Sequence, residues 1–196
     1  MAYAFETRPL TAATWPDLEE LFEVRGNAIV RDCYCMFFRR ARPAKDAPRP
    51  DPDSKAGLRA LVDGDGVTPG VTPGLVGYVD GGPAGWISLG PRPDFRRLER
   101  SRVMKQVDDT PVWSVVCTFV ARPFRGRGVQ HRLLAAAVEH ARDHGAGMLE
   151  AYPVDKPERS HPDSMFVGSR SLFERAGFTE VVRRSPTRVT MRLALR

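Results

Sequence analysis

The stretch that decides the fold leads from a predicted strand into a long predicted helix, and it reads Cys117-Thr118-Phe119-Val120-Ala121-Arg122-Pro123-Phe124-Arg125-Gly126-Arg127-Gly128-Val129-Gln130-His131-Arg132-Leu133-Leu134. The apolar, β-branched run 112–120 predicts the strand. Apolar residues spaced three and four apart predict the helix, which ends near His144-Gly145. A short basic turn joins the two. Such a turn leaves the first N–H groups of the helix unpaired and pointing at one spot, which is a place for an anion.

The turn has the residue types that a phosphate group requires. Glycines at 126 and 128 let a bulky anion approach the backbone. Arg125 and Arg127 add positive charge at the same place. The sequence therefore predicts a phosphate cradle, and the alternative is an ordinary solvated, arginine-rich turn.

Two well-known phosphate turns do not fit. A P-loop has Lys-Ser/Thr after its second glycine, where this chain has Val129-Gln130. The dinucleotide fingerprint has a third glycine, where this chain has His131, and it follows an early strand. The remaining pattern is Arg/Gln-x-x-Gly-x-Gly/Ala, which 125–130 matches except at Gln130. The turn thus resembles motif A of the GNAT superfamily of N-acetyltransferases.

A second landmark follows in the expected order. The segment 171–178 is similar to the "LYEKxGF" ending of the same superfamily, and further similarity to a bacterial subgroup of undefined substrate lies at 33–38, 85–87 and 150–153. The resemblance implies an α/β fold with a mixed, mostly antiparallel sheet, helices on both faces and a splayed central strand pair. It implies one domain over 1–196.

Other segments agree with a layered α/β chain. Strands are predicted at 3–7, 75–79, 84–89 and 147–153, with a hairpin turn at 80–83, and helices from Thr14 and over 54–62. Segments 31–53 and 63–74 are predicted as irregular loops. Near the C-terminus, apolar residues alternate with Arg188, Thr190 and Arg192, which predicts a strand with one solvated face.

The resemblance implies acetyl-coenzyme A as the cofactor. It places the pantetheine arm against the backbone of Thr118, Phe119 and Val120, and the pyrophosphate on the turn. The residues of the turn are Arg125, Gly126, Arg127, Gly128, Val129 and Gln130. Phe173 is also predicted to contact the cofactor, and it stands where many relatives have a tyrosine that protonates the departing thiolate, so the usual acid is absent. The alternative for 118–120 is that these residues pair only with a neighbouring strand.

Acetyl transfer to an amine needs help with protons. An amine with a pKa of about 10.4 loses its proton at pH 7 at a cost of roughly 4–5 kcal/mol, so a base or a water chain is required. By resemblance, Ser114 occupies a position where some relatives have a glutamate, and it could order a water. Glu150 is the carboxylate candidate, and a surface strand residue is its alternative. Tyr152 is the candidate substitute acid, and an aromatic packing residue is its alternative.

Composition excludes several classes of protein. The formal net charge is +6, and the longest apolar runs are too short to span a membrane. Three cysteines, an odd number, predict no disulfide scaffold and a reducing cytoplasm. Their spacing to the histidines predicts no metal site, and Cys33 and Cys35 are left without a role.

The main hypothesis is an N-acetyltransferase that moves an acetyl group directly to a primary amine of a small molecule or peptide. One alternative is a non-catalytic acyl-coenzyme A-binding module, because Phe173 removes the usual acid. Another is a nucleic-acid-binding protein, which rests on charge alone. The main hypothesis includes no nucleic-acid or membrane partner. Dimers are common among the proteins that the chain resembles, so a homodimer is considered.

Overall fold

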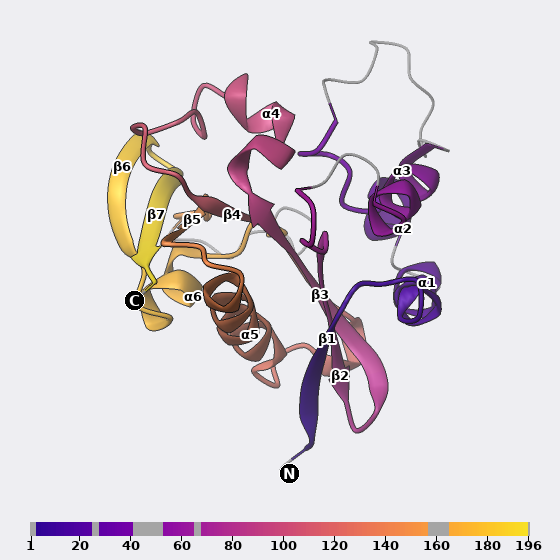
Figure 1. Cartoon of the computed structure of the whole chain (residues 1–196). Helices are drawn as coiled ribbons and strands as arrows, with labels where there is room; N and C mark the ends of the chain where they lie inside the picture. The colour runs from indigo at the N-terminus through magenta and orange to yellow at the C-terminus, as the bar shows by residue number, and fades with distance from the viewer. Residues whose placement is uncertain (1–2, 25–27, 41–52, 65–67, 157–164, 196) are drawn as a thin grey trace.

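A computed structural model describes residues 3–24, 28–40, 53–64, 68–156 and 165–195 (Figure 1). Seven strands form one sheet within this part of the chain, in the order β1-β2-β3-β4-β5-β7-β6. Neighbouring strands are antiparallel except β4 and β5, which are parallel. The predicted mixed, mostly antiparallel sheet is confirmed. The strands are β1 (Phe5–Pro9), β2 (Gly74–Val79), β3 (Gly82–Pro91), β4 (Trp113–Val120), β5 (Met148–Ala151), β6 (Thr179–Ser185) and β7 (Arg188–Ala194).

Helices cover both faces of the sheet, as predicted (Figure 1). One apolar core joins the sheet to α1 (Trp15–Glu23), α2 (Ala28–Cys33), α3 (Asp53–Val62) and α4 (Arg96–Glu99). The other joins it to α5 (Val129–Asp143) and α6 (Arg170–Arg175). Short 3-10 turns are η1 (Arg92–Asp94) and η2 (Arg122–Phe124). None of the helices in the described ranges is long and apolar enough to cross a bilayer.

Helix α2, which follows α1, was not predicted from the sequence. Segment 31–53 was predicted to be irregular, but α2 includes 31–33 and α3 begins at Asp53. The helix α2 is only six residues long, too short to be stable by local preference. It is held by tertiary contact, since Val30 is buried in the core. Residues 41–52 and 65–67 of the two predicted loops lie outside the described residues.

The predicted hairpin is present between β2 and β3. Asp80 and Gly81 both have positive φ, 51° and 84°, as a two-residue type I′ turn requires. The ladder resumes at once, with Gly82 opposite Val79. The turn therefore sets the register of the two strands.

The prediction of a solvated face on the last strand was wrong. Thr190 and Arg192 are both buried. The side chain of Arg192 reaches two carboxylates, Glu150 and Asp108. Ion pairing explains how a charged residue can be covered there.

The helix α5 lies very close to the sheet. A Cβ atom on Gly77 or Gly85 would stand 2.7 or 2.8 Å from a methyl carbon of Leu133. These glycines let the helix approach the backbone of β2 and β3. The close contact fixes the start of α5 beside the end of β4, where the basic turn lies.

Candidate functional site

The two central strands part after a short parallel pairing. β4 pairs with β5 only over 113–115, opposite 149–151. β4 then continues to Val120, whereas β5 ends at Ala151. This is the predicted splayed pair, and it opens toward the basic turn.

A bulge in β4 lies at the point of parting. Ser88 pairs with Cys117 and Leu89 with Val115, so Val116 is an extra residue in β4. A bulge bends a strand and increases its twist. It therefore directs the second half of β4 away from β5.

The basic turn follows β4 and η2 and presents free backbone donors. Gly126 and Gly128 have φ of 75° and 80°, and a Cβ on either would meet no atom within 4 Å. The backbone N–H groups of 126–130 have no backbone acceptor among the described residues. Gly128 is the N-cap of α5, so the positive end of the helix dipole points at the same place. The geometry is that of an anion site.

Tyr3 holds the turn from the start of the chain. Its hydroxyl donates to the carbonyl oxygen of Arg127 at 2.6 Å. The guanidinium groups of Arg127 and Arg132 each lie 4.8 Å from the centre of its ring. Arg125 turns back and donates through Nε to the Val120 carbonyl at 3.0 Å. The turn therefore has fixed basic side chains around its free N–H groups.

Three of the predicted cofactor-binding residues have side chains in the core. Phe119, Val129 and Phe173 are buried. Phe119 packs edge-on against Phe22, and Phe173 packs edge-on against Phe178. A ligand could contact Phe119 and Val129 only through their backbone.

Thr118 is bonded within the protein on the side of β4 that faces the gap. Its amide donates to the Phe166 carbonyl at 2.5 Å, and its hydroxyl donates to the same oxygen at 3.3 Å. Gln130 Nε2 donates to the Thr118 hydroxyl at 2.6 Å. The Thr118 amide is thus paired with a later segment of the chain and with neither neighbouring strand.

The three candidate catalytic residues meet in one buried cluster. Ser114, Glu150 and Tyr152 are each 0 % exposed. The Ser114 hydroxyl lies 2.9 Å from the Tyr152 hydroxyl, which donates to Glu150 Oε1 at 2.7 Å. The alternative of Glu150 as a surface residue is wrong.

Two buried arginines complete this cluster, and the sequence analysis missed both roles. Arg92 donates to Glu150 Oε1 at 3.1 Å and to the Tyr152 hydroxyl at 2.5 Å. Arg192 donates to Glu150 Oε2 at 2.8 Å and pairs with Asp108. Each oxygen of the Glu150 carboxylate therefore accepts from one of the two guanidinium groups. The signal for Arg192 was its place on an alternating strand, which equally fits a solvated face, and Arg92 in η1 had no such signal.

Tyr152 keeps its proton. Burial, and next the negative charge of Glu150, raise the pKa of the Tyr152 phenol well above its usual value. Since the hydroxyl accepts from Arg92 and Ser114 and donates to Glu150, all of its hydrogen-bonding capacity is used. Ser114, Tyr152 and Glu150 form a continuous path for a proton.

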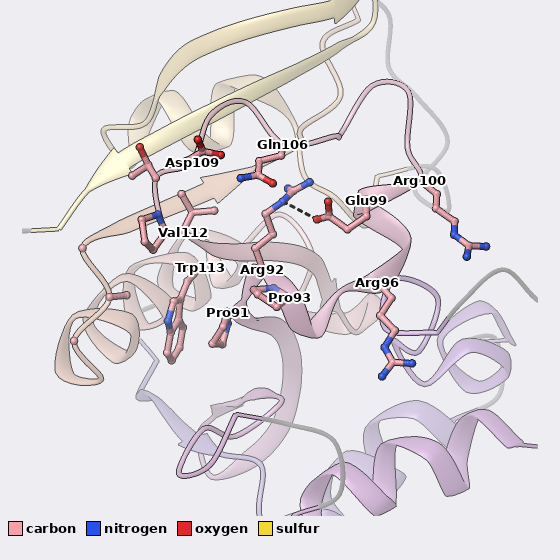
Figure 2. A pocket seen from close by; sticks show the side chains of 15 residues that line it. Pro91, Arg92, Pro93, Arg96, Glu99, Arg100, Gln106, Asp109, Val112 and Trp113 are labelled. Atoms are coloured by element: carbon pink, nitrogen blue, oxygen red, sulfur yellow. Dashed lines mark hydrogen bonds and ion pairs between the residues drawn. The ribbon is translucent and has the colours of Figure 1, made fainter.

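A cavity of about 790 Å³ adjoins the cluster at the other end of β4 (Figure 2). Its lining includes Trp113, Arg92 and the loop 145–147 after α5. Figure 2 shows Arg92 in its wall, joined to Glu99. This cavity does not include the basic turn, which lies beside the opposite end of the strand.

Two of the three cysteines pack against each other in the core. Cys35 and Cys117 are buried with their sulfur atoms 3.3 Å apart, and Trp86 donates to the Cys35 sulfur. Hydrogen bonding to Cys117, and then burial, raise the pKa of the Cys35 thiol. Burial raises the pKa of Cys33 to about 11. In the described residues, no three His, Cys, Asp or Glu side chains gather as a metal site.

The family follows from comparison with known proteins. The sequence matches the Acetyltransferase (GNAT) family over residues 36–178, a span that includes the splayed strands, the turn and α6. The chain belongs to the GNAT acetyltransferases. Among curated proteins, none matches the sequence.

Solved GNAT structures have the same fold at low sequence identity. One is called a histone acetyltransferase HPA2 and related acetyltransferase, from Corynebacterium glutamicum; it has 19% identity, a TM-score of 0.52 and coverage of 100% of this chain and 98% of that one. The ribosomal-protein-S18-alanine N-acetyltransferase of Escherichia coli has 12% identity, a TM-score of 0.52 and coverage of 98% and 94%. The NatC complex bound to Gag peptide and CoA has 11% identity, a TM-score of 0.52 and coverage of 98% of this chain and 99% of that one.

The turn fits the cofactor of the GNAT family. Acetyl-coenzyme A has a diphosphate, and the free N–H groups at 126–130 can donate to its oxygens. The open space at Gly126 and Gly128 leaves room for it. In this structure the Phe166 carbonyl occupies the Thr118 amide in the gap beyond Val115, so the pantetheine arm cannot pair with β4 at that residue.

Proposed function

We propose that this GNAT acetyltransferase moves the acetyl group of acetyl-coenzyme A directly to a primary amine of a small molecule or a peptide. The observation that carries the proposal is the set of free N–H groups at 126–130, next to strands that part after Val115. Acetyl-coenzyme A supplies the activated acetyl thioester. Similarity to N-acetyltransferases in the GNAT family supports an amine as the acceptor.

In this proposal, the backbone of the turn and Arg127 bind the diphosphate. The backbone of β4 from Thr118 to Val120 orients the pantetheine arm. Arg125 supports this indirectly, since it holds the Val120 carbonyl in place. Together these contacts hold the cofactor in one position, so that its reaction with a bound amine becomes effectively unimolecular.

The buried cluster is proposed to move the proton. The Ser114 hydroxyl would take a proton that arrives from the amine through a water. It would pass its own proton to the Tyr152 oxygen while the phenol proton moves to Glu150. Arg92 and Arg192 hold this carboxylate in place. The path uses a hydroxyl that stays protonated at neutral pH, as its raised pKa requires.

Titration calorimetry with coenzyme A, followed by thiol release from acetyl-coenzyme A across a panel of amines, tests the proposal. Binding together with amine-dependent thiol release is the expected result. Binding without transfer to any amine supports the alternative, a non-catalytic acyl-coenzyme A-binding module. Failure to bind coenzyme A at millimolar concentration contradicts both.

A further inference from the structure

Gln130 forms the start of a hydrogen-bonded chain that closes the gap between β4 and β5. Its side-chain amide donates to the Thr118 hydroxyl, and that hydroxyl donates to the Phe166 carbonyl. The Thr118 amide donates to the same carbonyl. One carbonyl oxygen therefore receives both donors of Thr118, and Gln130 fixes which way the hydroxyl points.

The segment that carries Phe166 is bonded on its other side as well. Val154 donates to the Gly168 carbonyl at 2.9 Å, and Arg170 donates to the Val154 carbonyl at 2.9 Å. Residues 166–170 thus lie between β4 and the chain that continues β5. Thr118 and Val167 are both buried there, and Phe173 packs under Gly168, where an added Cβ would lie 2.7 Å from the ring.

We propose that Gln130 controls access of the pantetheine arm, by holding residues 165–168 against β4 through Thr118. A backbone amide has a single hydrogen to donate. A pantetheine carbonyl that pairs with β4 at Thr118 must therefore replace the Phe166 carbonyl. This inference rests on the proposed function of the turn and strand.

The residue type at 130 is what makes this chain differ from the motif it resembles. The GNAT pattern has glycine or alanine at this position, and neither has a side-chain donor. Gln130 stands in the first turn of α5, beside the N–H groups that would bind the diphosphate. Its side chain links the diphosphate turn to the strand for pantetheine, so the two halves of the cofactor site are coupled through one hydrogen bond.

The test compares ligands with and without pantetheine. Coenzyme A and adenosine diphosphate, which has the diphosphate but no pantetheine, are titrated into the full chain and its variants. The variants are Gln130→Ala, Gln130→Met, which keeps the length of the side chain, and Thr118→Val, which keeps the backbone amide. Gln106→Met is the matched control, because Gln106 bonds to Asp108 away from the turn.

All three variants should bind coenzyme A about threefold to tenfold more tightly, because each removes at least one hydrogen bond of the chain from Gln130 through the Thr118 hydroxyl that helps to hold residues 165–168 against β4. Their affinity for adenosine diphosphate should equal that of the unmodified chain, and the control should change neither. Equal shifts for both ligands would overturn the inference, since Gln130 would then act on the diphosphate turn. Unchanged or weaker coenzyme A binding would overturn it too.

Hydrogen exchange gives a readout that needs no ligand. In the Gln130 variants, the Thr118 amide should exchange at least about threefold faster, because its bond to Phe166 opens more often. Unchanged exchange contradicts the role of Gln130 even if coenzyme A binds. If exchange changes as expected but no variant binds either ligand, the proposed function fails, and the control of pantetheine access fails with it.

Discussion

At the scale of single residues, the proposed site depends on backbone N–H groups and on buried hydroxyls. Gly126 and Gly128 adopt left-handed conformations that other residues rarely take. Ser114 and Tyr152 are buried hydroxyls whose hydrogens point along one path. Single substitutions at these positions should therefore distinguish effects on cofactor binding from effects on proton transfer.

Gly128→Glu should weaken coenzyme A binding by more than about tenfold, because a carboxylate at the N-terminus of α5 repels the diphosphate. Gly128→Gln is the control. It has the same size and the same strained φ of 80° without the charge. Calorimetry on both variants checks the prediction, and equal affinities for the two would show that the diphosphate binds elsewhere.

Tyr152→Phe should lower kcat for amine acetylation on the order of 100-fold with KM for acetyl-coenzyme A unchanged, because the ring stays and only the proton path is cut. Tyr78→Phe removes another buried hydroxyl, the one bonded to Asp17, and should leave kcat unchanged. Steady-state thiol release measures both. A purely structural cluster would instead lower the melting temperature of Tyr152→Phe and spare its kcat.

At the scale of elements, the position of α5 against β2 and β3 determines where its N-terminus points. Gly85 brings the helix so near that an added methyl group would stand 2.9 Å from the Phe119 carbonyl oxygen. That oxygen belongs to β4, so crowding at Gly85 is transmitted to the strand beside the turn.

Gly85→Ala should reduce the free energy of unfolding by about 1–3 kcal/mol, as overpacking of a close contact does. Gly147→Ala is the control, since a Cβ there meets no atom within 4 Å. Denaturant titration of both variants tests this. If Gly85→Ala were as stable as Gly147→Ala, the helix would not be held against the sheet at this point.

Elements also differ in how far their sequence alone predicts them. The turn at 125–130 and the helix after it could be predicted because their signals are local. The helix α2 could not, since it is short and depends on Val30 reaching the core. Arg92 and Arg192 were missed for a related reason: only the folded sheet brings them to Glu150 from distant parts of the chain. Likewise, Gln130 looked like a departure from a motif, and its partner Thr118 could be seen only in the structure.

At the scale of the whole molecule, stability should depend on pH through His140, whose ring lies beside Trp113. Burial, and next the proximity of His144, lower the pKa of His140 to about 4. Its Nε2 is buried without a partner among the described residues. The folded protein therefore keeps His140 neutral where the unfolded chain would bind a proton.

Because the pKa of His140 is lowered in the folded protein, acid should destabilise the fold. Between pH 6.5 and about 4 the unfolded chain binds more protons at this position, so stability falls as the pH falls through this range. His140→Leu should flatten the decline of melting temperature from pH 7 to pH 5. Thermal melts at several pH values check this, with His131→Leu as a more exposed comparison. An identical slope in the unmodified chain and in His140→Leu would rule out His140 as the cause.

The contact between Tyr3 and Arg127 has a practical consequence for anyone handling the protein. The third residue of the chain braces the loop that is proposed to bind the nucleotide. An affinity tag fused ahead of Tyr3 would disturb its contacts with Arg127. Weak cofactor binding measured on such a protein would then be an effect of the tag. Tags for ligand measurements therefore belong after the last strand.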